Sequence, residues 1–321
     1  MPGAWRIRAG IARLVPSVSN IEPLESQVTP SSWIRAGART ATLTASAALL
    51  VTTALMGEAH AAAPVWTETG SSLQGTLGAG EGVTTVHAAG GGDTVLYRGA
   101  GSIPLSVLVQ GWTHIGDPDS ADGYVFDAYQ SGASSPTSKM FRVTTPSGAS
   151  YEYVHTLVAG ELYNNSFDAV SPDSQWMVSG EWGTMDHLQI YPTPLLNPAT
   201  SPTGGSLDLS GLIQLDHPVN DIQGCDFTSA TQLICASDDS STTLFPDAKP
   251  LLEIDLSGPL TGGDTTGHVT DIGAIPQSSI CSGTFEAEGV DYDTTTGTLR
   301  LEMIQPSICG AVTTVYTYRR S

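Results

Sequence analysis

The 321-residue sequence has little positive charge: only two lysines, Lys139 and Lys249, accompany ten arginines. Thirty-two acidic side chains stand against these, so the formal net charge is -20 at pH 7. Contacts with a phosphate backbone require the opposite sign. We therefore expect no nucleic-acid partner.

The composition also lacks the material for long charged helices. Charged residues make up only 14% of the chain, whereas glycine (35) and proline (20) are frequent; this argues against a coiled coil. Hydrophobic residues reach 40%, which is enough to build a core and argues against wholesale disorder. One compact β domain is the simplest interpretation.

The apolar run from Ala41 to Met56 is too short to match the roughly 20 residues that span a bilayer. Arg35 and Arg39 precede it, and the small-residue sequence 59–61 (Ala-His-Ala) follows it. A charged region, an apolar region and an A-x-A site in this order are typical of a secretory signal, with a membrane anchor as the alternative. We predict a signal peptide with an over-long N-terminal extension at residues 1–61, and one extracellular domain at residues 62–321 that is not attached to a membrane.

Cleavage near Ala61 would make the mature chain still more acidic. The removed segment contains five arginines and three glutamates, which leaves 7 basic and 29 acidic side chains and a net charge of -22. Such a field repels anionic surfaces and favours cations. Calcium and neutral substrates are therefore more plausible ligands than phosphates or acidic polymers.

The four cysteines allow three disulfide connectivities, and export to an oxidising compartment favours two bridges. We predict Cys225 with Cys235, across a hairpin, and Cys281 with Cys309, within the last repeat. A zinc site is the alternative. It is disfavoured because no C-x-x-C and no Cys/His cluster with ligand spacing occurs.

Helical periodicity is almost absent after residue 62, and short apolar runs alternate with Gly, Pro, Asp, Ser and Thr clusters. The predicted strands share β-branched and aromatic residues. They include Tyr124–Tyr129, Met140–Thr144, Tyr151–Leu157, Trp176–Ser179, Leu188–Tyr191, Leu251–Leu256, Leu299–Ile304 and Thr313–Tyr318. Thr144 to Gly148 (TTPSG) predicts a hairpin turn, since Pro fixes a negative φ and Gly supplies a positive one.

Four segments share the pattern strand, polar turn, strand, and they start about 55 to 65 residues apart. They are His114–Phe126, Phe167–Glu181, Gln223–Asp238 and Glu288–Glu302. Four-stranded antiparallel units at such a period are typical of β-propeller blades. With the strands between Val83 and Val109, the repeat predicts an all-β fold with a single five-bladed propeller; six blades or a β-sandwich pair are the alternatives.

The segment Phe167–Glu181 resembles the blade pattern of many β-propellers. Its Ser171 to Trp176 (SPDSQW) matches an innermost strand that turns through S-P-D-G-x into the second strand. Ser174 stands where glycine is usual, and only this unit carries the full motif. The resemblance covers residues 65–321 as an architecture and identifies no specific family.

In a propeller the loops that enter the innermost strands converge at one mouth, so equivalent residues of successive blades meet there. A ring of carboxyls at that mouth suits general acid/base hydrolysis of a glycosidic bond, because burial and like charges separate the carboxyl pKa values. We predict four catalytic residues: Glu288 as the acid, Asp168 as the base or nucleophile, and Asp117 and Asp226 as orienting groups.

Other polar and aromatic residues near these loops are candidates for ligand contact: Glu286, His114, Asn165, Trp112 and Trp182. The same ring suits calcium coordination. Asp117, Asp119 and Asp122 form a carboxylate-rich loop without EF-hand spacing.

No G-x-S-x-G and no strand–helix G-x-G-x-x-G occurs, which disfavours a serine hydrolase elbow and a dinucleotide site. The sequence therefore predicts a monomeric secreted propeller that acts on an extracellular carbohydrate. A non-enzymatic propeller of lectin or scaffold type that binds carbohydrate or protein, with calcium as a stabilising ion, is the alternative. The pattern does not decide between the two.

Overall fold

The computed structural model describes residues 65–88 and 90–320, so the predicted signal peptide lies outside the described residues. Strands dominate this part. The exceptions are two short 3-10 turns, η1 (Ala100–Ser102) and η2 (Ser307–Cys309), and one short helix, α1 (Leu105–Leu108). Among the described residues, no helix has the length and apolar character that crossing a membrane requires.

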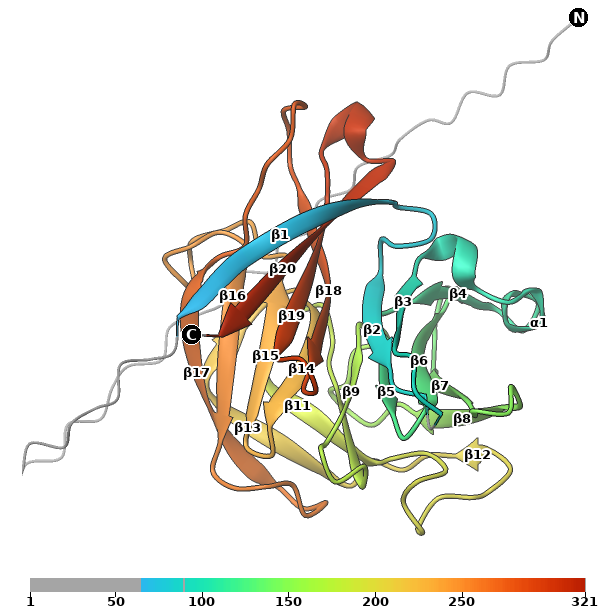
Figure 1. Cartoon of the computed structure of the whole chain (residues 1–321). Helices are drawn as coiled ribbons and strands as arrows, with labels where there is room; N and C mark the ends of the chain where they lie inside the picture. Colours follow the sequence, from blue (N-terminus) through green and yellow to red (C-terminus); the bar gives the residue numbers. More distant parts are fainter. Residues whose placement is uncertain (1–64, 89, 321) are drawn as a thin grey trace, which may run out of the picture. The chain divides into compact units, whose positions relative to one another are not determined.

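The described strands form four hydrogen-bonded sheets (Figure 1). A four-stranded sheet has the order β1 (Trp66–Gly75), β20 (Val312–Arg320), β19 (Thr298–Ile304) and β18 (Glu286–Asp293). A two-stranded sheet pairs β2 (Gly82–Val86) with β3 (Thr94–Arg98).

The two remaining sheets are larger. One has the order β12 (Gly205–Ser206), β8 (Ser150–Thr156), β7 (Ser138–Thr144), β6 (Tyr124–Ser131) and β4 (Trp112–Ile115), and β5 (Asp119–Ala121) also pairs with β6. The other has eight strands in the order β14 (Ile222–Ser229), β15 (Gln232–Ser237), β16 (Pro250–Leu256), β17 (Thr265–Ala274), β13 (Gly211–Val219), β11 (Met185–Pro192), β10 (Trp176–Ser179) and β9 (Asp168–Val170).

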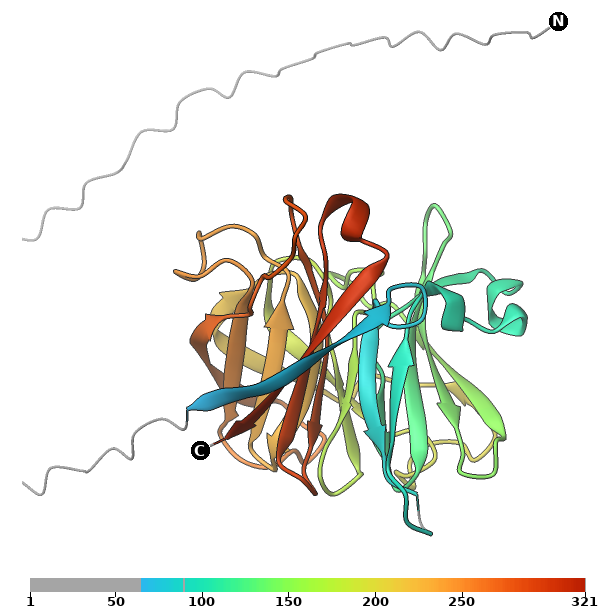
Figure 2. The same ribbon diagram turned by 45° about the horizontal axis from the view of Figure 1, so that its top comes forward.

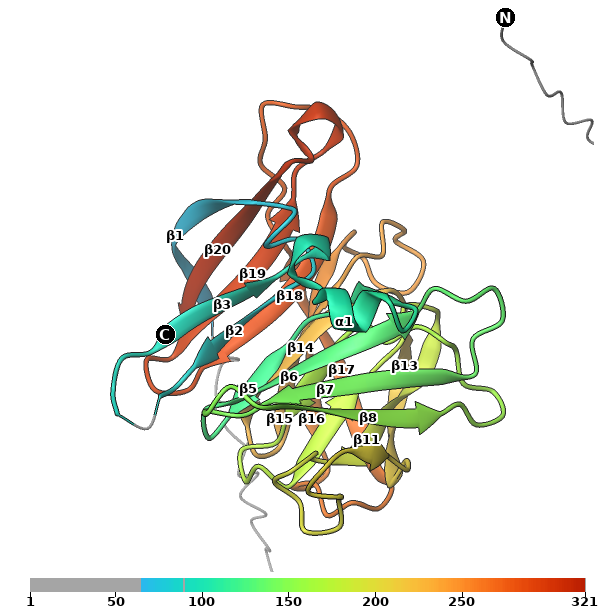
Figure 3. The same cartoon turned by 90° about the vertical axis from the view of Figure 1, so that its right-hand side faces the viewer.

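Five strands that begin successive antiparallel units form the centre of the described fold. Strands β2, β5, β9, β14 and β18 each lie against the next, and β18 lies against β2, so they form a closed ring. The sheets extend outward from this ring, and Figure 3 shows the β6–β8 sheet and the β18–β20 sheet as separate layers. This arrangement is a β-propeller, as the sequence repeat predicts.

The five-blade count stays a prediction. Hydrogen bonds divide the strands into four sheets rather than five, because β13 pairs in parallel with β17 and so joins two successive units into one eight-stranded sheet. The N-terminal strand completes the last sheet. Its register runs from Trp66 opposite Arg320 to Gly75 opposite Val312, and Figure 2 shows β1 lying along β20.

The turn of the Phe167–Glu181 unit shows how its sequence works. The Asp173 carboxylate accepts hydrogen bonds from the Ser171 hydroxyl (2.6 Å) and the Gln175 N–H (3.0 Å), while the Trp176 N–H donates to Ser171 Oγ (3.0 Å). Ser174 adopts φ 60°, the left-handed conformation that glycine usually supplies at this position. The serine is therefore accommodated by the side-chain bonds around it.

Each of the eight predicted strands overlaps an observed strand. The segment from Val83 to Val109 holds most of β2 and all of β3, but it ends in the helix α1. The predicted hairpin at residues 144–148 is present. There the Thr145 N–H donates to the Ala149 carbonyl (2.8 Å), and Gly148 has φ 86°. Both predicted disulfides are confirmed. Cys225 and Cys235 face each other across β14 and β15, and Cys281 is bonded to Cys309, so the second bridge ties the loop before β18 to the turn before β20.

Candidate functional site

Three strands of the central ring place equivalent residues at the same depth, around the side chain of Asp117. Each carries a Glu-Gly or Gln-Gly pair: residues 81–82 at the start of β2, residues 223–224 in β14 and residues 288–289 in β18. A Cβ added at Gly82 or Gly289 would lie 2.5 Å from Asp117 Oδ1, and one at Gly224 would collide with Asp117 Oδ2. Glycine is required at these positions because a carboxylate occupies the space of the side chain.

Asp117 is the hub of this contact. It is fully buried, the Val83 N–H donates to its Oδ1 (2.9 Å), and the Val290 N–H donates to its Oδ2 (3.0 Å). Together with the three glycines, it separates the two ends of the ring. Residues that precede the glycines face one end, and residues that follow them face the other.

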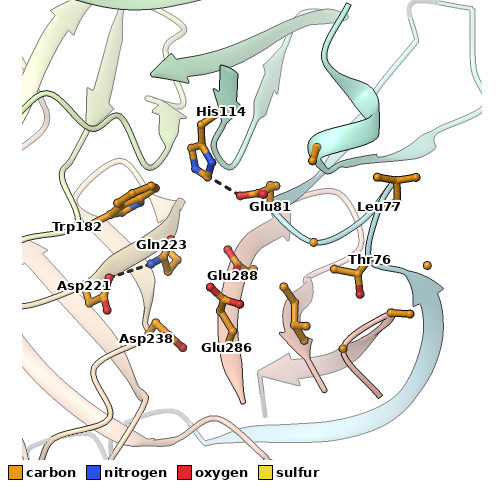
Figure 4. A pocket seen from close by; sticks show the side chains of 16 residues that line it. Thr76, Leu77, Glu81, His114, Trp182, Asp221, Gln223, Asp238, Glu286 and Glu288 are labelled. Atoms are coloured by element: carbon orange, nitrogen blue, oxygen red, sulfur yellow. Dashed lines mark hydrogen bonds and ion pairs between the residues drawn. The ribbon is translucent and has the colours of Figure 1, made fainter. Parts of the chain in front are cut away.

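The larger cavity, here called the entry pocket, lies where the central strands begin. It has a volume of about 690 Å³. Figure 4 shows its labelled lining side chains: Thr76, Leu77, Glu81, His114, Trp182, Asp221, Gln223, Asp238, Glu286 and Glu288. A second cavity of about 220 Å³, the exit pocket, lies where the central strands end, and its lining includes Asp119, Asp122, Asp226 and Asp291.

The four predicted catalytic carboxyls do not share one opening. Glu288 lines the entry pocket, Asp226 lines the exit pocket, and Asp117 and Asp168 are fully buried and line neither. The cause is strand geometry. Each residue advances a strand by about 3.3 Å, so a side chain three residues beyond the mouth lies about 10 Å deeper.

The central aspartates instead satisfy main-chain donors of neighbouring strands. Each of four carboxylates accepts a hydrogen bond from a backbone N–H group: Asp119 from Val170 (2.5 Å), Asp168 from Asp119 (2.9 Å), Asp226 from Tyr292 (2.6 Å) and Asp291 from Thr85 (2.7 Å). Strand edges that do not pair leave such donors without acceptors. Burial raises the pKa of Asp117, Asp168 and Asp226 well above the ordinary value. These aspartates are better explained as structural groups that link the strands of the ring than as catalytic groups.

The predicted calcium loop does not gather its ligands. Backbone donors use both carboxylate oxygens of Asp117 and both of Asp119, and Asp122 occupies a turn with φ 52°. Within residues 65–88 and 90–320, no group of three or more Asp, Glu, His or Cys residues is arranged to hold a metal ion. The residues present do not fit a bound calcium.

Among the predicted ligand contacts, Glu286, His114 and Trp182 line the entry pocket. Asn165 does not, because it is fully buried, where it accepts from the Ser179 hydroxyl (2.8 Å) and donates to the Met140 carbonyl (3.3 Å). Trp112 also lies elsewhere, against the small apolar cluster around Tyr129.

Glu81 and His114 form a neutral pair at the pocket wall. Burial and the Glu286 carboxyl raise the pKa of Glu81 to about 8, and burial lowers the pKa of His114 to about 4. Glu81 Oε2 lies 3.4 Å from His114 Nε2 (Figure 4). Between these two pH values the imidazole is uncharged and Glu81 holds a proton that can be donated.

Asp221 faces the same pocket in the opposite protonation state. Burial and the Asp238 carboxyl raise its pKa only to about 6, and Gln223 Nε2 donates to its Oδ1 (2.9 Å). Its backbone has φ 55°, its N–H donates to the Trp182 carbonyl (2.8 Å), and its carbonyl accepts from the Asp238 N–H (2.7 Å). Asp221 is therefore an ionised carboxylate at neutral pH, held in a conformation that few side chains other than Asp and Asn adopt readily.

Two aromatic rings form another part of the wall. His114 and Trp182 meet edge to face with their ring centroids 4.8 Å apart. The backbone N–H of Trp182 donates to Asn164 Oδ1 (2.8 Å), which ties this wall to the loop before β9. The pocket thus combines carboxyls, an uncharged imidazole and an indole.

The prediction from sequence missed Glu81. The signal that identifies it is the shared Glx-Gly pair, because residues 81–82, 223–224 and 288–289 enter three central strands in one register. Two residues per strand form too short a pattern to stand out in the sequence, and their shared position becomes visible only where the folded strands lie next to one another.

No family model matches the sequence, and no curated protein matches it significantly. Solved structures with some likeness include a gluconolactonase from Xanthomonas campestris, with 13% identity, a TM-score of 0.37, and coverage of 74% of this chain and 65% of that one. A periplasmic gluconolactonase from Pseudomonas aeruginosa has 12% identity and a TM-score of 0.33, with 56% and 47% coverage. The β-propeller domain of Swd1 from Myceliophteria thermophila has 10% identity and a TM-score of 0.30, with 56% and 46% coverage.

The match therefore spans less than two thirds of the length of each of these proteins. All three TM-scores are below 0.5. The propeller assignment comes from the closed ring of strands and not from these likenesses.

Proposed function

We propose that the entry pocket hydrolyses a glycosidic bond of an extracellular carbohydrate, with Glu81 as general acid and Asp221 as general base. One observation carries this proposal: two carboxyls of one pocket are held in opposite protonation states between about pH 6 and pH 8. Environments that separate two carboxyl pKa values in this way are typical of acid/base pairs. These roles replace those predicted for Glu288 and Asp168.

In the proposed step the Glu81 proton passes to the glycosidic oxygen as the bond between that oxygen and the anomeric carbon breaks. Asp221 accepts a proton from a water molecule whose oxygen attacks the anomeric carbon. The step leaves Glu81 ionised and Asp221 protonated. Exchange with solvent restores both states, so water is the only co-reactant.

Three properties of the pocket support a carbohydrate. Its volume of about 690 Å³ lies within the range of small-molecule sites. The rings of Trp182 and His114 offer apolar faces to a sugar ring. The net charge of -20 and the acidic lining disfavour anionic polymers.

The test measures reducing ends released from a panel of uncharged and basic polysaccharides at pH 7. Glu81→Gln and Asp221→Asn should each lower kcat/KM about 10²–10⁴-fold, while thermal melting shows that the fold is kept. Glu68→Gln is the matched control, because Glu68 is exposed on β1 and outside the pocket.

Full activity in either pocket variant contradicts the assignment of Glu81 and Asp221 as acid and base. A parent protein that binds a glycan of the panel without turnover supports the binding-propeller alternative.

We also propose that the chain is exported and acts as a monomer. The two disulfides support an oxidising compartment. Expression with residues 1–61 attached should release a chain that begins near Ala62, as N-terminal sequencing of the culture medium would show. A chain retained with its first 61 residues contradicts the export proposal.

A further inference from the structure

Glu288 is a buried carboxyl that faces the entry pocket without a partner. Its residue is 4% exposed, its side chain lines the cavity (Figure 4), and no donor or cation among the described residues is bonded to its oxygens. A buried carboxyl that lacks donors bears an uncompensated desolvation cost. The position therefore requires hydrogen-bond donors that the described protein does not supply.

The strand next to β18, β19, does not supply a cation to Glu288 either. It carries Glu302, which is fully buried, and neither oxygen of Glu302 has a partner within residues 65–88 and 90–320. Burial and the Glu81 carboxyl raise its pKa well above the ordinary value. The interior behind Glu288 thus adds acid groups rather than neutralising them.

The nearby basic side chains are already engaged. Lys249 is paired with the Asp238 carboxylate and also donates to the Asp238 carbonyl (3.2 Å). Arg300 and Arg98 pair with Asp291 and Asp127, both at 2.5 Å, and neither arginine lines the pocket. Glu81, Glu286 and Glu288 consequently share the cavity with no protein cation bonded to them.

We propose that the entry pocket binds the ammonium group of an amino sugar, with Glu288 and Glu286 as its acceptors. An ammonium carries three donors and a positive charge. It can therefore donate to Glu288 and stabilise the ionised form of that carboxyl, which burial and the neighbouring carboxyls otherwise disfavour by raising its pKa. A sugar hydroxyl donates one hydrogen and brings no charge. The rings of Trp182 and His114 lie in the same cavity and can pack against the sugar ring. This assignment of a substrate class rests on the proposed carbohydrate function.

The test compares three tetramers with the same β-1,4 linkage by calorimetry at pH 7 and low salt: glucosamine, N-acetylglucosamine and glucose. The glucosamine tetramer should bind at least tenfold more tightly than the other two, and its advantage should shrink with added salt. Equal or tighter binding of either uncharged tetramer overturns the proposal. Equal binding of 1,5-diaminopentane overturns the assignment to a sugar.

Variants locate the contact. Glu288→Gln keeps the shape of the side chain and should reduce the preference for the glucosamine tetramer at least tenfold; Glu286→Gln, at an exposed position, should reduce it without disturbing the fold. Glu68→Gln should leave it unchanged. An unchanged preference in both pocket variants overturns the proposal.

The two proposals fail separately. Hydrolysis of the glucose tetramer without preferential binding of the glucosamine tetramer refutes the amino-sugar assignment and keeps the proposed hydrolysis. Preferential binding of the glucosamine tetramer without release of reducing ends keeps the assignment and refutes the hydrolysis.

Discussion

At the scale of single residues, neighbouring positions on strand β18 have different structural roles. Glu288 faces the entry pocket, Gly289 makes room for Asp117, and Asp291 accepts the Thr85 N–H near the other end of the ring. The sequence predicts that acidic residues gather here, because Asp and Glu recur at the strand entries. It does not predict which of them face solvent, because that depends on how far each strand has advanced past the mouth.

The pH dependence of hydrolysis follows from two of these residues. We expect kcat/KM to rise as Asp221 ionises near pH 6 and to fall as Glu81 loses its proton near pH 8. A pH–rate profile on the best substrate of the panel measures both limbs. Activity that stays level from pH 7 to pH 10 would exclude Glu81 as the acid.

Close approach to Asp117 gives a residue-scale prediction of stability. In Gly289→Ala the new Cβ would lie 2.5 Å from both Asp117 Oδ1 and Gly82 Cα. Backbone shifts of this kind cost about 1–3 kcal/mol, which denaturant unfolding would measure. Gly258→Ala is the control, because a Cβ there meets nothing within 4 Å. Equal stability of the two variants would contradict the hub role of Asp117.

At the scale of elements, a buried ionic network joins β7 to the unit that starts with β9. Lys139 Nζ lies 2.7 Å from Glu181 Oε1 and 3.1 Å from Glu161 Oε1, and Glu161 Oε2 lies 2.9 Å from His155 Nε2. Burial alone would raise the pKa of Glu161, but the His155 hydrogen bond and the Lys139 charge outweigh it and hold the pKa at about 2. No sequence motif predicts this network, because its four members are spread over residues 139–181 and come from two strands and two loops.

Removal of the buried lysine should therefore be costly. Lys139→Met leaves the buried side chains of Glu161 and Glu181 without their cation, and breaking such a pair costs about 3–5 kcal/mol. Arg319→Met, at an exposed position on β20, should change the free energy of unfolding by less than about 0.5 kcal/mol. Chemical denaturation of both variants decides the matter, and a Lys139→Met protein as stable as the parent would show that the network adds nothing.

At the scale of the whole described molecule, the repeat in the sequence predicts the ring because each unit brings its own turn and its own alternating strands. The merging of two units through β13 and β17 is not predictable in the same way. It depends on two outer strands meeting side by side, and neither strand carries a signal for its partner. The entry pocket is likewise a product of closure, since Glu81, Asp221 and Glu288 belong to three different units.

Closure also buries many carboxyls, and this sets how stability depends on pH. The pKa of Glu81 is about 8 and that of Asp119 about 7, both above their ordinary values, so the folded chain binds more protons than the unfolded chain between about pH 4 and pH 8. Each group then lowers the free energy of unfolding by about 1.4 kcal/mol per pH unit as pH rises through its interval. Glu161 acts in the opposite direction, because its pKa of about 2 removes stability only as pH falls below about 4.5.

The melting temperature should therefore be highest near pH 4–5 and fall on the order of 10 °C by pH 8. Calorimetric scans at fixed ionic strength across this range would measure it. Glu81→Gln and Asp119→Asn should each flatten the decline, since an amide does not titrate. A melting temperature that rises from pH 5 to pH 8 would mean that the carboxyls of the ring remain ionised in the folded chain, and that Glu81 does not hold the proton on which the proposed hydrolysis depends.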